Sequence, residues 1–337
     1  MSGMQFYKCK KENNCQIKND LRNTCRACRL QRCFDVGLVC PKSEEYKRQL
    51  AATTKKQGSN FYDQDLTIST TTTPSSLMSE LSETSSPYPT LDHLLKGIRT
   101  FLDSQKSLVL IEKQFQQGPM DDEFILIKKP KYDLLEKGCI SLVYSMLNEY
   151  FEPFCLLQHE QKIELMKSLL LKFSILTKSY LSAKNFPDSA DHRLMTHPGY
   201  IIDLNYTEYF FLDKSNPKGI WPCMLEGIKL LYCLKKKFVK QGISEMDISA
   251  LAYVIYSIES EKLAIHIETV EQVKNSVFKE LLTYYVSNFG FDQGAIKYSN
   301  LLNLVHNINE VKNWFHECYT AAKIFDPTLL YVWEDCC

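Results

Sequence analysis

Residues 25–37 read Cys25-Arg26-Ala27-Cys28-Arg29-Leu30-Gln31-Arg32-Cys33-Phe34-Asp35-Val36-Gly37. With Cys9 and Cys15 upstream, the first two cysteines of this run give the spacing C-x5-C-x9-C-x2-C. Four thiolates suit a tetrahedral zinc ion, and the C-x2-C pair lets two sulfurs from one turn reach the same ion. The predicted zinc ligands are Cys9, Cys15, Cys25 and Cys28. Redox-active or incidental buried cysteines are the alternative to a metal site.

A basic helix is expected to begin at Cys25, the third of the four cysteines. Thr24 is a good N-cap and Gly37 a good C′ residue, so the helix should span residues 25–36. Arginines at a spacing of three fall on one side of such a helix, whereas its apolar residues fall on another. The side chains predicted to contact DNA phosphates are Arg22, Arg26, Arg29 and Arg32. A merely solvated basic face is the alternative.

The charge of the chain is unevenly distributed. The 337 residues carry 40 basic and 40 acidic side chains, which excludes a uniformly basic nucleic-acid binder. Residues 1–48 nevertheless hold six lysines and five arginines against five acidic residues, a net charge of +6, and six of the thirteen cysteines fall within the first forty positions. No apolar run reaches the length of a membrane span, and the start lacks the apolar segment of a signal peptide. We therefore expect no membrane association, and cysteines in a reducing compartment.

The composition divides the chain into three parts. Residues 1–48 form the basic, cysteine-rich module described above, and residues 49–90 follow as a linker. Twenty of the forty residues from 51 to 90 are Ser, Thr or Pro, so this stretch lacks the apolar surface that would offset the entropy of ordering it. A flexible linker is predicted, and a phosphorylated regulatory hinge is the alternative. Residues 91–337 form the third part.

Helical periodicity dominates residues 91–337, so the predicted fold class is mostly α, an all-α layered helical domain with a short strand or hairpin. The first helix should be capped by Thr90, and the helix near 159–182 is apolar around most of its circumference, which places it in the middle of the domain. The Ile- and Tyr-rich segment 199–206 is the candidate strand or hairpin, and Ser244 with Asp247 resembles a capping box. The other predicted helices span about 134–150, 219–241, 245–260, 266–289 and 293–324. A short last segment follows Pro327.

Motifs typical of enzymes were not found. The chain has no H-E-x-x-H, no G-x-S-x-G and no G-x-x-x-x-G-K-[ST] sequence. His192 and His197 stand near Asp188 and Asp191, but the stretch is interpreted as a surface loop without a third catalytic partner. The sequence therefore predicts a protein that is not an enzyme.

The run of residues 25–37, together with Tyr7, Lys8 and the upstream cysteines, resembles the second zinc finger of nuclear hormone receptors and is most similar to the expanded nematode branch. The block from Phe154 to Ser168 is similar to the receptor ligand-binding domain signature around its third to fifth helices. Residues 301–324 look like the long tenth helix, and residues 331–334 resemble the activation helix.

The resemblance implies a Zn²⁺-dependent transcription factor in the nucleus that regulates RNA polymerase II genes in response to a lipophilic ligand. Its implied partners are DNA, coregulator proteins and a second receptor, in a homo- or heterodimer. It also implies a C-terminal helix that closes over the ligand and completes a coregulator groove, with Lys167 and Glu334 as the charged positions; a simple C-terminal packing helix is the alternative. Glu149 stands where the family carries a lysine of that groove. No ligand contacts are assigned.

One departure bears on DNA binding. The family has two fingers and reads bases with the first, whereas Met1 precedes Cys9 by eight positions here. We therefore expect weak or non-specific DNA binding from the chain as it stands. It would be a truncated isoform or the product of an incomplete gene model, or it would act without reading bases. The second function to be considered is a truncated receptor that does not read DNA sequence and acts as a ligand- or partner-binding regulator.

Overall fold

The structure is a computed structural model that describes residues 86–114, 124–214, 216–265 and 267–335. The four predicted zinc ligands, the predicted phosphate-contacting arginines and nearly all of the predicted linker lie outside these residues. They remain predictions from the sequence.

The described residues are mostly helical, as the apolar periodicity predicts. The helices are α3 (Pro89–Gln114), α4 (Lys129–Tyr150), α5 (His159–Asn185), α6 (Pro217–Gln241), α7 (Glu245–Lys262), α8 (Ile267–Phe289), α9 (Phe291–Phe325) and α10 (Val332–Asp335). Short 3₁₀ helices span Phe154–Leu156 and Thr207–Phe211. None of the helices in this described part is both long and apolar enough to cross a membrane.

The start of α3 differs from the sequence prediction in its capping residue and in the end of the linker. Thr90 does not cap the helix, because the helix already begins at Pro89, and the last two residues of the predicted linker therefore belong to α3. A carboxylate from α8 takes the place of the cap: Glu280 accepts hydrogen bonds from the backbone N–H groups of Thr90 at 3.2 Å and Leu91 at 2.8 Å. A negative charge at this end also interacts favourably with the helix dipole. Six apolar residues that repeat at helical spacing in α3 are all buried: Leu91, Leu94, Leu95, Ile98, Phe101 and Leu102.

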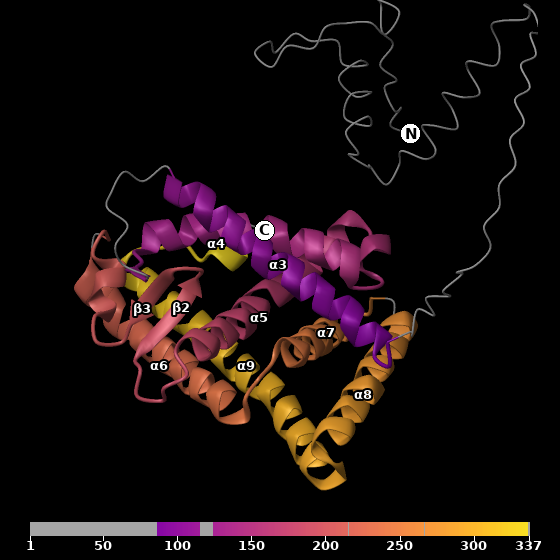
Figure 1. The fold of residues 1–337 in the computed structure, drawn as a ribbon. Helices are drawn as coiled ribbons and strands as arrows, with labels where there is room; N and C mark the ends of the chain where they lie inside the picture. Colours follow the sequence, from indigo (N-terminus) through magenta and orange to yellow (C-terminus); the bar gives the residue numbers. More distant parts are fainter. Residues whose placement is uncertain (1–85, 115–123, 215, 266, 336–337) are drawn as a thin grey trace, which may run out of the picture. The chain divides into compact units, whose positions relative to one another are not determined.

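The helices form layers around α5 (Figure 1). α3 and α4 pack against each other on one side, and α5 and α7 cross the middle of the domain. α6 and α9 pack together on the other side, and α8 contacts α9 and diverges from it beyond the turn that joins them. α5 contacts α6, α7, α9 and β2, so the prediction that it lies in the middle is confirmed. Two lysines of α5, Lys172 and Lys178, are nevertheless buried there.

A small three-stranded sheet lies at one end of the helical layers, in the order β1-β3-β2. The strands are β1 (Ile125–Leu126), β2 (Arg193–His197) and β3 (Tyr200–Asp203). β2 and β3 pair antiparallel as a hairpin, and Ile125 of β1 pairs in parallel with Tyr200. The predicted segment 199–206 supplies β3 only. β2 was missed because its residues lie next to a Pro- and Asp-rich stretch, and β1 because two residues carry no periodicity.

α7 begins with the predicted capping box. The Ser244 side chain accepts a hydrogen bond from the Asp247 backbone N–H, and the Asp247 carboxylate accepts one from the Ser244 backbone N–H at 2.7 Å. Asp247 has a second role, since its other oxygen accepts a hydrogen bond from the Tyr285 hydroxyl at 2.5 Å. The cap thereby joins the start of α7 to α8.

Candidate functional site

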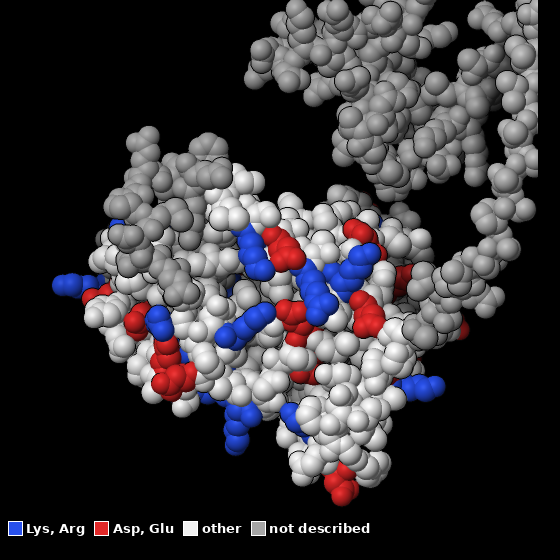
Figure 2. All heavy atoms as spheres, in the orientation of Figure 1, with Lys and Arg blue, Asp and Glu red and all other residues white. Residues whose placement is uncertain are grey.

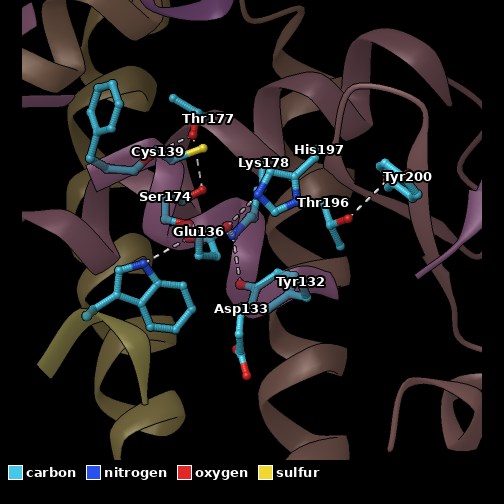
Figure 3. Close-up of polar contacts among 12 residues, drawn as sticks. Tyr132, Asp133, Glu136, Cys139, Ser174, Thr177, Lys178, Thr196, His197 and Tyr200 are labelled. Carbon is cyan, nitrogen blue, oxygen red and sulfur yellow. Dashed lines mark hydrogen bonds and ion pairs between the residues drawn. The ribbon is translucent and has the colours of Figure 1, made fainter. Parts of the chain in front are cut away.

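The best-defined polar site of the described residues is centred on Glu136 of α4, which is buried (Figure 3). Its carboxylate forms an ion pair with the ammonium group of Lys178 from α5. The same carboxylate accepts a hydrogen bond from the indole Nε1 of Trp333, in α10, at 3.0 Å. His197 of β2 places its Nε2 3.0 Å from the other oxygen. Four elements far apart in sequence therefore meet at one carboxylate.

Lys178 is fully engaged by its neighbours. Besides Glu136, its Nζ donates to the Tyr132 hydroxyl at 2.8 Å and to the Ser174 hydroxyl at 2.6 Å. The ammonium also lies 5.3 Å from the centre of the Trp333 ring, within the range of a cation–π contact. The positive charge is thus matched inside the protein by one carboxylate and by oriented polar groups.

The burial of this cluster sets its protonation. Burial alone raises the pKa of the Glu136 carboxyl, but Lys178 and His197 lower it, and the pKa falls to about 2. Burial lowers the pKa of His197 below its ordinary value, so its imidazole is neutral at pH 7. The pKa of the neighbouring Tyr132 hydroxyl is raised, chiefly by burial. At neutral pH the cluster therefore holds one anion and one cation, with no net charge.

The interpretation of His197 as part of a surface loop is wrong. The residue ends β2, its side chain has no exposed surface, and Glu136 and Lys178 surround it. The position of His197 could not be predicted from residues near it in the sequence, because Glu136 is 61 positions away and belongs to another helix. His192, by contrast, is exposed and packs its ring on Tyr232 at a centroid distance of 5.5 Å, as a loop residue does.

Two cavities flank the cluster, and Trp333 lines both. The smaller, about 20 Å³, lies between α3, α4 and α5 and is bordered by Gln105, Cys139 and Thr177. The larger, about 50 Å³, lies between α4, α5, α6, α9 and the hairpin, and most of its lining is apolar. Representative lining side chains of the larger cavity are Met195, Phe210, Met224, Ile228 and Phe315. This volume holds a few water molecules, whereas pockets for drug-sized ligands measure about 300–1,000 Å³.

Seven large aromatic residues of the helical domain could border a ligand pocket, and two of them line the cavities described above. Phe210 lines the larger cavity and Phe173 the smaller. The others belong to the core or to the partly buried shell around it: Phe151, Phe154, Tyr180, Phe211 and Trp221.

The C-terminal segment Leu329–Asp335 reaches the larger cavity through Trp333. Lys129 of α4 donates a hydrogen bond from Nζ to the Leu330 carbonyl oxygen at 2.8 Å and also pairs with Asp133. The Tyr331 ring stacks on Tyr319 of α9 at a centroid distance of 4.4 Å. The segment is thus attached to α4 by polar contacts and to α9 by an aromatic one.

The two residues predicted for a coregulator groove lie on different elements. Lys167 is exposed on α5, and Glu334 is a residue of the short helix α10, which contacts both α4 and α5. Leu156 and Ile163, close in sequence to Lys167, are large apolar side chains that are also exposed. Glu149, at the position where a lysine was expected, is an exposed residue near the end of α4.

The outer surface of the helical domain carries charges of both signs. On the face shown in Figure 2, basic and acidic side chains alternate. A hollow of about 240 Å³ on the surface is lined by Arg99, Lys106, Lys184, Asp103 and Glu245, and Glu245 pairs there with Arg99 and Lys184. This pattern differs from the single-sign surface that phosphate binding needs, so the prediction of DNA contact rests on residues 1–48.

Within the residues that the structure describes, no group of three or more His, Cys, Asp or Glu side chains is arranged to hold a metal ion. The predicted zinc ligands lie elsewhere in the sequence, and their donor chemistry, four cysteine thiolates, is the set that structural zinc sites use.

Comparison with known proteins agrees with this architecture. Residues 132–325, more than half of the chain, match the ligand-binding domain of nuclear hormone receptor. Residues 1–40 match the double treble clef zinc finger of C4 type. A zinc finger of this type implies zinc binding.

Individual relatives support the same assignment. The high zinc activated nuclear receptor protein of Caenorhabditis elegans is 27% identical over 232 residues, which cover 66% of this chain and 55% of the relative. Nuclear hormone receptor family member nhr-53 of the same organism is 21% identical over 322 residues, covering 93% of this chain and 78% of the relative. Human hepatocyte nuclear factor 4-gamma is 28% identical over 132 residues, 36% of this chain and 31% of the relative. The match to the first of these relatives thus spans about half of its length.

The polar cluster was not found from the sequence, although one signal was present: Lys172 and Lys178 interrupt an otherwise apolar stretch of α5, and charges that face a core need buried partners.

The helical layers and the matches to both family domains lead to one assignment: the chain belongs to the nuclear hormone receptor family, whose members are transcription factors rather than enzymes.

Proposed function

We propose that this receptor is a zinc-dependent transcription factor of the nucleus that regulates RNA polymerase II genes in response to a lipophilic ligand. The observation that carries the proposal is the mostly apolar cavity beside Glu136, which is lined in part by Trp333 of the C-terminal segment Leu329–Asp335. Contact between a ligand and Trp333 would couple the contents of the cavity to the position of that segment.

The ligand would enter the larger cavity by displacing side chains, since the present volume is about 50 Å³. Met195 and Met224 line the cavity, and unbranched methionine side chains adapt their shape more readily than branched ones. The charges of the neighbouring cluster cancel, so an uncharged apolar molecule meets no isolated charge there.

The coregulator would be an amphipathic helix held between Lys167 and Glu334, with the exposed Leu156 and Ile163 beneath it. Deletion of residues 327–337 should abolish recruitment of coregulator peptides, and Lys167→Glu should weaken it about tenfold or more. Lys240→Glu, at an exposed position on α6, is the matched control. Fluorescence anisotropy of labelled peptides measures all three, and full recruitment by the deletion variant would contradict the proposal.

DNA binding would depend on zinc held by Cys9, Cys15, Cys25 and Cys28, with Arg22, Arg26, Arg29 and Arg32 on the phosphates. Dimerisation, with a second copy or another receptor, is part of the proposal. Gel shifts of the full chain and its Cys25→Ser variant on duplex DNA, at several salt concentrations, test the DNA contacts. A sequence-selective complex that needs Cys25 supports a transcription factor that reads DNA.

Binding that is equal on all sequences and disappears above about 0.1 M salt indicates phosphate contacts alone. That result would favour the second function, a receptor that does not read DNA sequence and acts by binding a ligand or a partner. Metal analysis of the same samples should find one zinc ion per chain, bound at the four-cysteine site. The Cys25→Ser variant should contain less zinc.

A further inference from the structure

The surface hollow of about 240 Å³ lies where α3 passes over the end of α5 and the start of α7. Residues 99, 102, 103 and 106 of α3 line it, and their spacing of i, i+3, i+4 and i+7 places them on one face of the helix. Apolar lining comes from Leu102, from Leu181 of α5 and from Pro198 in the turn between β2 and β3. We call this feature the α3 hollow.

One end of the α3 hollow has a surplus of positive charge. Glu245, in the first turn of α7, accepts from Arg99 Nε at 2.8 Å and from Lys184 Nζ at 3.2 Å. Two cations therefore share one carboxylate. Two helical turns further along α3, about 10 Å away, Lys106 pairs with Asp103 at 2.9 Å and the charges cancel. An anion is thus attracted to the Arg99 end of the hollow.

Arg99 keeps hydrogen-bond donors for such an anion. Among the described residues its guanidinium group forms one hydrogen bond, from Nε to Glu245, so the N–H groups on both terminal nitrogens are left over. The side chain is 59% exposed, which leaves these donors open to a molecule in the hollow. The planar fork of a guanidinium group matches the two oxygens of a carboxylate.

Gln105 provides an independent sign of a missing partner. Its side chain is 4% exposed and lines both the α3 hollow and the smaller cavity. Its Nε2 donates to the Cys139 sulfur at 3.4 Å, but its buried Oε1 accepts no hydrogen bond from the described residues. A buried acceptor without a donor costs free energy, and such atoms call for a water molecule or a ligand group.

We propose that the α3 hollow is a second binding site of this receptor, which takes a small organic monocarboxylate with a short apolar chain. The carboxylate binds Arg99 and Lys184, and the chain lies over Leu102, Leu181 and Pro198. A monoanion balances the surplus of one positive charge, whereas a phosphate dianion would leave excess negative charge beside the acidic residue that the two cations already share.

The inference does not rest on the proposed function. The residues that line the α3 hollow differ from those that line the larger cavity, so either site can be empty while the other is filled.

Methyl NMR spectroscopy of the full-length chain, titrated with hexanoate in low-salt buffer, tests the site. The methyl resonances of Leu102 and Leu181 should shift and reach saturation, and added salt should weaken the binding. The methyl groups of Met224 and Ile228, in the larger cavity, report on binding there. The alcohol 1-hexanol, which has the same chain and no charge, should leave Leu102 and Leu181 unshifted at the same concentrations.

Substitutions at the two ends of the α3 hollow should have different effects. Arg99→Gln should weaken hexanoate binding about fivefold, and Lys184→Gln should do the same if the first variant fails to fold. Lys106→Gln, at the neutral end, is the matched control and should change the affinity less than about twofold, because salt screens a charge at that distance. Glu245→Gln frees both cations and should therefore tighten the binding.

Four outcomes would overturn the second site. The first is no shift of the Leu102 and Leu181 methyl groups with hexanoate, and the second is an equal shift with 1-hexanol. The third is equal affinity of the Arg99→Gln and Lys106→Gln variants. The fourth is a hexanoate shift confined to Met224 and Ile228, which would place the molecule in the larger cavity alone.

Discussion

Two buried ion pairs of α5 look alike in sequence but differ in their surroundings. Lys178 pairs with Glu136 of α4, and Lys172 pairs with Glu259 of α7 at 2.5 Å. Glu259 also accepts from Lys262, three residues later on its own helix. Glu136 instead accepts from Trp333 of the C-terminal segment. The first pair therefore lies beside the C-terminal segment and contacts it through Glu136, whereas the second joins two helices of the core.

Removing Lys178 should have the largest effect. Lys178→Met leaves the Glu136 carboxylate buried without its cation, and the free energy of unfolding should fall by about 3–5 kcal/mol. Urea titration of the full chain followed by circular dichroism measures this loss. A fall of less than about 1 kcal/mol would mean that Glu136 is not the buried anion that the structure indicates.

Removing Lys172 should cost less, because Lys262 remains 2.9 Å from Glu259. Lys172→Met should lower the free energy of unfolding by about 1–3 kcal/mol. The same variant should leave hydrogen exchange of residues 326–335 unchanged, which Lys178→Met should not. Equal effects of both variants on that peptide would remove the distinction between the two ion pairs.

The pH dependence of stability separates the clusters further, because only the Glu136 cluster contains a histidine. The pKa of His197 is lowered from 6.5 by burial, so below pH 6.5 the unfolded chain takes up a proton that the folded chain does not. The free energy of unfolding should therefore decline as the pH falls below 6.5, by up to about 1.4 kcal/mol per pH unit. The decline from this group should end at the pKa that His197 has in the folded protein.

The measurement compares urea titrations at pH 7 and pH 5.5 for the wild type and His197→Gln, with His192→Gln at the exposed neighbouring position as the control. The slope should be smaller in His197→Gln and unchanged in His192→Gln. A further decline should follow between pH 4.5 and about 2, where Glu136 is ionised in the folded state only.

The smallest effect is expected at Lys262, whose side chain is 57% exposed. Lys262→Gln removes a surface partner of Glu259 and should change the free energy of unfolding by about 0.5 kcal/mol or less. In a Lys172→Met background the same substitution should cost more, since Glu259 would then lose its last cation. Purely additive effects in this double-mutant cycle would show that the two lysines do not share Glu259.

The sequence predicts what depends on neighbours along the chain. The apolar spacing of α3 and the capping box of Ser244 and Asp247 are local patterns, and the structure confirms both. The Glu136 cluster depends on residues that are 42, 61 and 197 positions away from Glu136, namely Lys178, His197 and Trp333. Such pairing is decided by how the helices pack, which periodicity does not encode.

The same reason explains the error at Thr90. A residue that is a good cap in isolation was predicted to cap α3, but the structure uses Glu280 from α8, 190 positions away. The zinc site differs from this case, because the spacing of its four cysteines along the sequence is enough to predict it. That site stays a prediction, since its residues lie outside the described part of the chain.

The capping of α3 by Glu280 also has a consequence for how the domain begins. Unwinding the first turn of α3 would deprive that carboxylate of two amide donors, so the entry of the chain into the domain is tied to a helix near the other end of the sequence. A protease that cleaves the preceding Ser- and Thr-rich stretch should therefore stop near Pro89. The trimmed fragment would mark the natural border for producing the helical domain by itself.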